Sequence, residues 1–392
     1  MKIIKILKPV LSVVIIVALL AGAQKLVQPK YASGVVEGNF TSEYYEETTK
    51  HDVLFVGDCE VYENVDPIYL WSHYGITSYI RGNAQQLAWQ SYYMLEDTLK
   101  RETPKVVIYN VQALTHAQPQ KEEYNRMTLD GMRWSKTKWN AIRASMCEGE
   151  KMIDYVFPLL RYHSRITELT GEDFTYFNKH KKTLHNGYYM RVDVLPVSES
   201  DVADVTWILG DKESEEQTEE EDIIDPWAEI EGAEEEEEVD NSLTDTKEGE
   251  PFGSLPMEYL DRIRTLCEQK GIQLILMKAP SAAPVWYDSD NQQILDYADK
   301  NHLPYINFYD LLEETGIDYE TDTYDGGLHM NLSGAEKISE YLGRTLSESY
   351  KMVDHRGESE YDKVYEEKVA FHDDMKRKQE EELKKYGEIR NY

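Results

Sequence analysis

Short apolar runs alternate along this chain with segments of helical spacing. Five runs have the length and composition of buried strands, at 53–56, 77–80, 105–109, 272–277 and 305–308. Helical patterns lie between and after them, at 67–74, 84–101, 256–269, 291–300 and 335–349. Continuous apolar strands separated by helices are typical of a parallel sheet that is covered on both faces. The pattern therefore predicts an α/β fold, a three-layer α/β/α sandwich around a parallel five-stranded sheet.

Segment 1–26 has the pattern of an N-terminal transmembrane anchor or an export signal. An apolar run at 9–23 follows three basic residues, Lys2, Lys5 and Lys8. The basic side of such a segment stays in the cytoplasm, which places the body of the protein outside the membrane. The small residues at 21–23 also fit a signal-peptidase site. We expect a single-pass membrane anchor with an extracytoplasmic body, with a cleaved signal or a buried helix as the alternatives.

The other segments divide the chain into parts. The sheet domain is expected to occupy 51–197 and 251–352, and its first part contains an irregular helical insertion at 115–191. We expect this insertion to pack on the sheet and shape a pocket. The polar segment 27–50 is interpreted as a stalk. The charged segment 353–392 predicts an amphipathic helix, which is either a solvated flank or a surface for a partner.

The charge of the chain is concentrated in one insertion. The formal net charge is −32, and 198–250 contains about 23 acidic and 2 basic residues. Such a segment cannot bury a core, so a disordered acidic loop is predicted, with a cation-binding or partner-binding tail as the alternative. Nucleic acid is an unlikely partner because phosphate binding needs clustered Lys and Arg.

The chain has three cysteines and none of the spacings that indicate a zinc site. Cys59, Cys147 and Cys267 are too few for a disulfide framework. Three free thiols are the favoured interpretation. We expect no metal.

Residues capable of chemistry follow the predicted strands, at 57–60, 81–83, 110–112, 278–281 and 325–329. Because the carboxyl ends of parallel strands meet at one edge of a sheet, these residues should gather there. Among them are a nucleophile, Cys59, and a base, His329. Asp325 could orient His329 across two flexible glycines. Together they form a predicted acyl-transfer triad.

An oxyanion formed by such a triad needs hydrogen-bond donors. The backbone N–H groups of Cys59 and Gly82 are candidates, together with the side-chain amide of Asn83 or Asn110. Asp58 and Lys278 are expected beside the pocket.

The reactivity of Cys59 has two opposed interpretations. A helix N-terminus and His329 would favour the thiolate. The acidic neighbours Asp58 and Glu60 would raise the pKa of the thiol and disfavour it. The alternative is a buried, inert cysteine in a protein without turnover.

Two further basic residues lie in the helical insertion. Helices are predicted at 136–144 and 152–170, and the second carries His163 and Arg165. These side chains could line a pocket for an anionic glycan or a lipid phosphate. A structural ion pair is the plainer alternative.

The motifs Gly57-Asp58-Cys59, Gly82, an Asn after a strand and Asp325…His329 resemble the SGNH/GDSL hydrolase superfamily. The closer likeness is to a membrane-anchored, extracytoplasmic branch of Gram-positive bacteria. That branch is similar to the D-alanyl transfer protein of teichoic acid modification and to alginate O-acetylation proteins. The likeness extends from about 52 to 343, omits the acidic insertion and includes the motifs at 125–132, 159–165 and 328–337.

The resemblance implies a flavodoxin-like α/β/α fold, hydrolysis or transfer of O-linked acyl groups on envelope glycans, and no cofactor. The expected partners are an acylated polysaccharide or a teichoic-acid-like polymer, and a multi-span membrane acyltransferase. The sequence departs from the family pattern at three places. Cysteine replaces the nucleophilic serine, Gly326 stands where the family has its acid, and the family's GxND motif is absent.

Two functions therefore follow from the sequence, beside a weaker third, a thiol redox sensor, which would need Cys147 or Cys267 close to Cys59. The first is an SGNH-like esterase or O-acyltransferase that uses a Cys59–His329–Asp325 triad. The second is a catalytically inactive SGNH-fold binding or scaffold subunit of an envelope-polymer modification complex.

Overall fold

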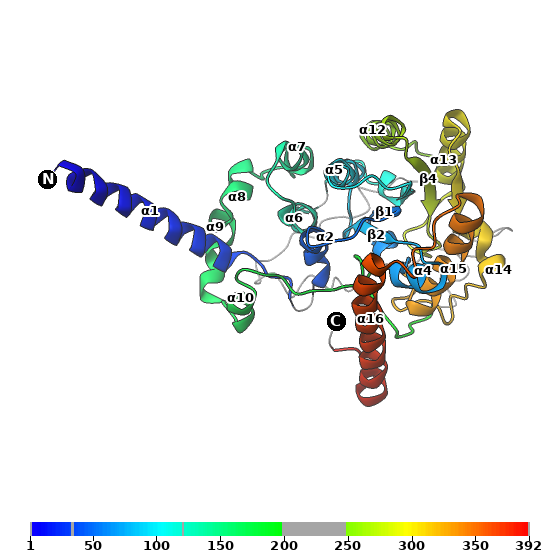
Figure 1. Ribbon diagram of the computed structural model, residues 1–392. Helices are drawn as coiled ribbons and strands as arrows, with labels where there is room; N and C mark the ends of the chain where they lie inside the picture. Colours follow the sequence, from blue (N-terminus) through cyan, green and yellow to red (C-terminus); the bar gives the residue numbers. More distant parts are fainter. Residues whose placement is uncertain (1, 33–34, 120, 198–247, 391–392) are drawn as a thin grey trace, which may run out of the picture.

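The computed structural model describes residues 2–32, 35–119, 121–197 and 248–390, and it has a five-stranded, all-parallel sheet (Figure 1). The strand order is β2-β1-β3-β4-β5. The strands are β1 Val53–Gly57, β2 Ser78–Gly82, β3 Val106–Asn110, β4 Gln273–Lys278 and β5 Tyr305–Asn307. All five predicted strands are present, within two residues of their predicted bounds, so the α/β prediction is confirmed.

Helices cover both faces of the sheet. Successive side chains of a strand point to opposite faces, so each strand packs against helices on both sides. Leu54 and Val56 of β1 pack in one core with α5 (Ala88–Thr98) and α12 (Ser254–Lys270). Val53 and Phe55 pack in the other core with α4 (Pro67–Tyr74) and α15 (Leu332–Ser349). Each strand is thus buried on both sides, which explains its continuous apolar sequence.

The remaining helices are short, apart from α13 (Asp288–Asn301) and two terminal helices. They are α3 (Cys59–Tyr62), α6 (Glu122–Asp130), α7 (Lys136–Ser145), α8 (Met152–Val156), α9 (Pro158–Tyr162), α10 (Gly171–Thr175) and α14 (Leu312–Thr315). The single helix expected at 152–170 is divided into α8, α9 and the 3-10 helix η3 (His163–Thr167). Pro158 causes the first break, because proline starts a helix more readily than it continues one.

The segment expected as a polar stalk, 27–50, instead packs onto the sheet domain. It forms the 3-10 helix η1 (Val36–Asn39) and the helix α2 (Phe40–Tyr44). Phe40 is buried beside Tyr62, and Tyr44 is buried beside Tyr79 of β2. Periodicity did not reveal this packing, because the segment is rich in Tyr and Glu and has no apolar stripe.

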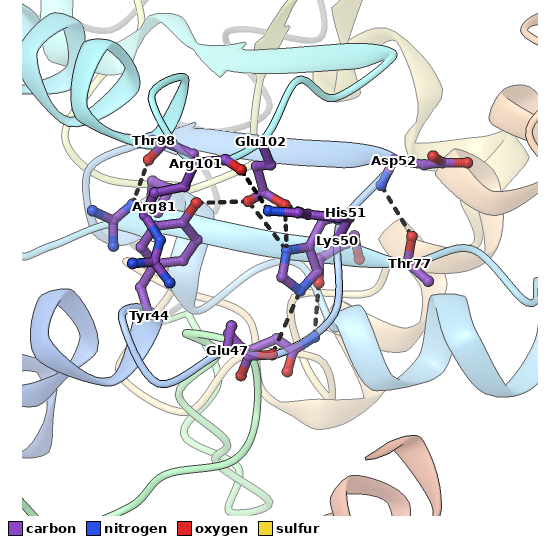
Figure 2. A network of polar contacts seen from close by, with 12 residues as sticks. Tyr44, Glu47, Lys50, His51, Asp52, Thr77, Arg81, Thr98, Arg101 and Glu102 are labelled. Atoms are coloured by element: carbon purple, nitrogen blue, oxygen red, sulfur yellow. Dashed lines mark hydrogen bonds and ion pairs between the residues drawn. The ribbon is translucent and has the colours of Figure 1, made fainter. Parts of the chain in front are cut away.

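Figure 2 shows the buried polar network that holds this segment next to the start of β1. His51 Nδ1 lies 3.1 Å from Glu102 Oε2, and its Nε2 lies 3.7 Å from Glu47. Tyr44 donates a 2.7 Å hydrogen bond to Glu102, and Lys368 forms an ion pair with Glu47. Although burial opposes the charge, the two glutamates raise the pKa of His51 above its ordinary value.

Replacing His51 with Leu is expected to lower the free energy of unfolding by about 3 kcal/mol near pH 6, because it breaks a buried charged network. The raised pKa of His51 stabilises the fold below its ordinary pKa of 6.5, and this contribution is lost as the pH rises through the raised value. Hydrogen bonding to His51 and the charge of Lys368 lower the pKa of Glu47 to about 2 despite burial, so its contribution is lost only in strong acid.

The difference between wild type and H51L, measured by urea unfolding, should therefore be largest between about pH 4.5 and 6.5 and smaller at pH 9. The exposed His73, changed to Leu, is the control and should show no such profile. A pH-independent difference would show that His51 contributes by packing alone.

The C-terminal helix α16 (Ser359–Tyr386) is part of the fold rather than a solvated flank. Tyr365 is buried and stacks on Trp71 of α4, with ring centroids 4.0 Å apart. His372 Nε2 lies 2.8 Å from Asp66 Oδ2, at the start of α4. Tyr365 and His372 lie seven residues apart and therefore on one face of the helix, which is the buried face.

The N-terminal helix α1 (Lys2–Val27) is long and apolar enough to span a membrane. Its apolar window covers Lys8–Val27, and only a small part of that window is buried against the rest of the chain (Figure 1). The predicted acidic loop at 198–250 lies, except for its last three residues, outside the described residues.

Candidate active site

Cys59 lies at the carboxyl end of β1, in the turn into α3. The strand ends at Gly57, where a Cβ atom would lie 2.4 Å from Val61 and 2.9 Å from Cβ of Asn110. Asp58 caps α3 by accepting a hydrogen bond from the backbone N–H of Glu60. Cys59 is the first residue of α3, is only partly buried and carries a free thiol.

His329 and Asp325 form a directly hydrogen-bonded pair before α15. His329 Nδ1 lies 2.6 Å from Asp325 Oδ2, and the backbone N–H of His329 donates a 2.9 Å hydrogen bond to Asp325 Oδ1. The chain between them turns through Gly326 and Gly327, both at positive φ. A Cβ on Gly327 would also lie 2.5 Å from Val197. The two glycines thus allow the tight turn that aligns the acid with the imidazole.

The imidazole of His329 acts electrostatically on the thiol of Cys59. Burial raises the pKa of Cys59, the charge of His329 lowers it, and the charge of Asp58 raises it again, so the net direction is upward. Burial lowers the pKa of His329, but the charges of Glu63, Cys59 and Asp325 outweigh it and hold this pKa well above its ordinary value. Near neutral pH, the pair is therefore a thiol beside an imidazolium.

A second acid, Glu63, faces His329 and was not anticipated from the sequence. Its Oε2 lies 3.6 Å from His329 Nδ1, and it accepts a hydrogen bond from the hydroxyl of Tyr324. Glu63 is buried, and burial raises its pKa. Its position four residues after Cys59 places both on one face of a short helical turn, which is the sequence signal that could have identified it.

Glu37 of η1 adds a third carboxyl group to this neighbourhood. It is buried, and burial raises its pKa to about 8, so it holds a proton at neutral pH. Glu63 disfavours a negative charge on Glu37, whereas His329 and Arg191 favour it. Arg191 lies over the ring of Tyr324, 4.4 Å from the centroid, and pairs with Asp193. No pattern in the sequence connects Glu37 with residues almost 300 positions away.

Asn110, one of the predicted oxyanion donors, is instead held in a buried network. Its Nδ2 donates to Asp58 at 3.3 Å and to Glu60 at 2.8 Å, and its Oδ1 accepts from the N–H of Ala279. Lys278, expected beside the pocket, lies 2.7 Å from Glu60 in a fully buried ion pair. This network fixes the backbone around Cys59. Because Asn110 has both amide hydrogens engaged, it is a positioning residue rather than an oxyanion donor.

Gly82, at the end of β2, lies next to the backbone that precedes Cys59. A Cβ at Gly82 would lie 3.1 Å from the carbonyl oxygens of both Gly57 and Asp58, so the end of β2 approaches the turn that holds Cys59. Asn83 donates from Nδ2 to the Thr41 hydroxyl at 3.1 Å, and its buried Oδ1 has no hydrogen-bond partner. Asp58 faces Glu60 and Asn110, and burial together with the charge of Glu60 raises its pKa to about 6.

His163 and Arg165 lie on η3, next to the end of α1. Arg165 pairs with Asp173 at 3.1 Å and donates to the carbonyl oxygen of Val27, while His163 Nδ1 lies 3.1 Å from the carbonyl oxygen of Leu160. These contacts belong to the helices beside α1 and not to the Cys59–His329 pair. The contacts of Arg165 match the structural ion-pair interpretation.

Among the described residues, one group could also hold a metal ion: Glu63, Asp325 and His329. One ligand atom from each lies within 4.8 Å of the others. Carboxylate and imidazole ligands suit a divalent cation such as Zn²⁺. The 2.6 Å separation between His329 Nδ1 and Asp325 is a hydrogen bond, which would have to break for Nδ1 to bind a cation.

Replacing Glu63 with Gln should make Cys59 react faster with iodoacetamide at pH 7, because the negative charge of Glu63 raises the pKa of the thiol. The same change should lower the pKa of His329. An E63Q rate that equals the wild-type rate would mean that Glu63 does not act electrostatically on the pair. The matched control is E96Q, on α5, which should leave the rate unchanged.

The described residues therefore bring Cys59, His329 and Asp325 together at the carboxyl edge of the sheet, with Gly82 close by. Comparison with known proteins assigns no family to the chain, because no family model matches it and no curated protein is significantly similar to it.

Proposed function

We propose that this protein is a membrane-anchored, extracytoplasmic hydrolase or O-acyltransferase of the SGNH type, which acts on acylated envelope glycans. The observation that carries the proposal is the 2.6 Å hydrogen bond between His329 and Asp325, together with the electrostatic influence of His329 on the Cys59 thiol. A nucleophile, a base and an orienting acid in hydrogen-bond sequence are the elements of acyl transfer. The resemblance of the motifs to the SGNH superfamily supports the same reaction class.

The proposed reaction has two steps. The Cys59 sulfur attacks the ester carbonyl carbon, the thiol proton passes to neutral His329, and the sugar alcohol leaves with that proton, which gives a thioester. Water or a second sugar hydroxyl then attacks the thioester, and Cys59 recovers its proton. Asp325 holds the imidazole in one orientation throughout. The N–H groups near Gly82 and Cys59 are the proposed donors to the oxyanion.

The raised pKa values set the pH dependence of this reaction. His329 must lose its proton before it can accept one from Cys59, and its pKa lies well above the ordinary value. The rate should therefore rise with pH through the alkaline range, without a plateau at neutral pH.

The test is iodoacetamide labelling of the full-length protein from pH 5 to 9, with site-specific readout by mass spectrometry. Labelling of Cys59 should increase steeply with pH and should slow in His329→Ala, which loses the charge that favours the thiolate. Buried Cys267 is the internal control. If Cys59 labels like a free thiol and H329A changes nothing, the proposed nucleophile is refuted.

A chelator separates the thiol mechanism from metal chemistry at the same residues. Treatment with EDTA should leave both Cys59 labelling and esterase activity unchanged, because the proposed pair acts without a metal. Loss of activity with EDTA, restored by Zn²⁺, would instead assign Glu63, Asp325 and His329 to a metal.

The second candidate function is a catalytically inactive scaffold subunit beside a multi-span acyltransferase. The upward direction of the Cys59 pKa favours it, because a neutral thiol is a poor nucleophile. If the protein is such a scaffold, C59A should bind acylated polymer with wild-type affinity. Neither the wild type nor C59A should release acyl groups.

The proposal also includes α1 as a membrane anchor. Helix α1 has one apolar window of 20 residues, and the lysines before it favour a cytoplasmic N-terminus. The sheet domain would then lie outside the membrane, where the envelope polymer is.

A further inference from the structure

The helices α8, α9 and α10 lie around the end of α1 from which the chain enters the sheet domain (Figure 1). The closest packing is between α1 and α9, and η3 and α10 also contact α1. Arg165 donates to the carbonyl oxygen of Val27, and Lys25 donates a 2.9 Å hydrogen bond to Asn178. The apolar window of α1 runs to Val27, so these helices pack where the window ends.

Large apolar side chains on these short elements point away from the protein. Five of them are about half exposed or more: Ile153 (45%), Phe157 (48%), Leu160 (53%), Ile166 (59%) and Phe174 (63%). They come from α8, α9, η3 and α10 and from the residue between α8 and α9. Exposed apolar residues gathered within 22 positions of one another are unusual for a surface that faces water.

The position of these side chains identifies what covers them. A helix of 20 apolar residues is about 30 Å long, the thickness of the hydrocarbon core, so its last residues lie at the boundary between acyl chains and headgroups. Elements that pack on those residues are at the same depth. Apolar side chains of short interfacial helices enter this boundary by about 5–10 Å.

We propose that α8, α9, η3 and α10 form a membrane-contact surface, which rests on the outer leaflet of the bilayer that α1 spans. The inference rests on the anchor proposed above, and it concerns a different part of the chain from the triad. It gives the domain a second attachment to the lipid, so that the domain is fixed against the membrane rather than suspended from a single helix.

The attraction is apolar rather than electrostatic. Arg161 on α9 pairs with Glu122 and Glu123, and Arg165 pairs with Asp173. Basic side chains of the surface are therefore largely neutralised by acidic ones. Binding to lipid should persist at 1 M salt, where the Debye length falls to about 3 Å and surface charge attraction is screened.

The test uses a photoreactive benzoyl-phenylalanine in the full-length protein, reconstituted in nanodiscs of phosphatidylcholine and phosphatidylglycerol. The probe replaces Leu160 or Phe174 on the proposed surface, and Val14 in the middle of α1. Leu295 on α13 is the matched control, because it is an equally apolar side chain with 42% exposure on a helix distant from α1. Irradiation is followed by mass spectrometry of lipid adducts, at low salt and at 1 M salt.

Lipid adducts are expected at 14, 160 and 174 at both salt concentrations, and none at 295. Adducts at 14 without adducts at 160 and 174 would overturn the surface and leave the anchor standing. Absence of adducts at all four positions would overturn both. If the probes at 160 and 174 capture a protein instead of lipid in native membranes, the surface is a protein interface and the inference is wrong.

Discussion

Cys59→Ala is expected to reduce ester hydrolysis by at least about 10³-fold, because removal of a triad nucleophile leaves only binding and oxyanion stabilisation. His329→Ala should reduce the rate by a similar factor, and the double variant should be no slower than either single one, since the two residues act as a unit. The measurement is release of 4-nitrophenol from its acetate at pH 8 by the full-length protein.

The matched control for C59A is C147A, which removes a partly buried thiol from outside the site. Mass spectrometry of the wild type, quenched during turnover, should find an acetyl group on Cys59 that hydroxylamine removes. Equal rates for the wild type and C59A would exclude the proposed nucleophile and leave the scaffold function as the better conclusion.

The activity of the Cys59→Ser variant is a related test, because serine is the nucleophile of the family that the motifs resemble. A serine hydroxyl needs His329 as a neutral base, and the C59S protein loses the ionisable sulfur whose charge helps to raise the pKa of His329. An active C59S variant would indicate that the site is built for general-base catalysis. An inactive one would indicate that the pair depends on sulfur.

Lys278→Met is expected to lower the free energy of unfolding by about 3–5 kcal/mol, because it leaves the buried carboxylate of Glu60 without its counter-charge. Lys278 and Glu60 are both almost fully buried, and their charged atoms lie 2.7 Å apart. The lysine nitrogen also lies 5.5 Å from the ring centroid of Trp286 and 5.1 Å from that of Tyr309. Urea unfolding at pH 7 measures the difference.

The double variant E60Q/K278M is the control for this interpretation. It removes both charges and should recover much of the loss, because a neutral pair of similar volume has no unpaired charge to bury. Lys337→Met, which breaks a partly exposed pair with Asp322, should cost less. If E60Q/K278M is as unstable as K278M, packing and not charge explains the effect.

The sequence was sufficient to predict the sheet and the core of the site. Buried parallel strands have continuous apolar runs, and the carboxyl ends of such strands meet at one edge. The apolar pattern was therefore enough to place Cys59 and Gly82 at that edge. The glycines after Asp325 indicated the turn that the chain makes there.

Other parts of the site depend on contacts that leave no local pattern. Glu37 and Tyr324 reach His329 or its partner Glu63 through the packing of η1 and of the loop before α15. The interpretation of 27–50 as a stalk failed for the same reason, since tyrosines buried by hydrogen bonding to Glu102 and Asp97 look polar in sequence. Asn110 was correctly placed at a strand end, but its amide binds neighbouring acids and not solvent.

The buried face of α16 has a consequence for the order in which the domain can be assembled. Lys368 neutralises Glu47 and His372 neutralises Asp66, although more than 300 residues separate each pair. The N-terminal acids therefore remain without these partners until α16 has packed against the domain. A truncation that removes α16 would consequently act on the beginning of the fold.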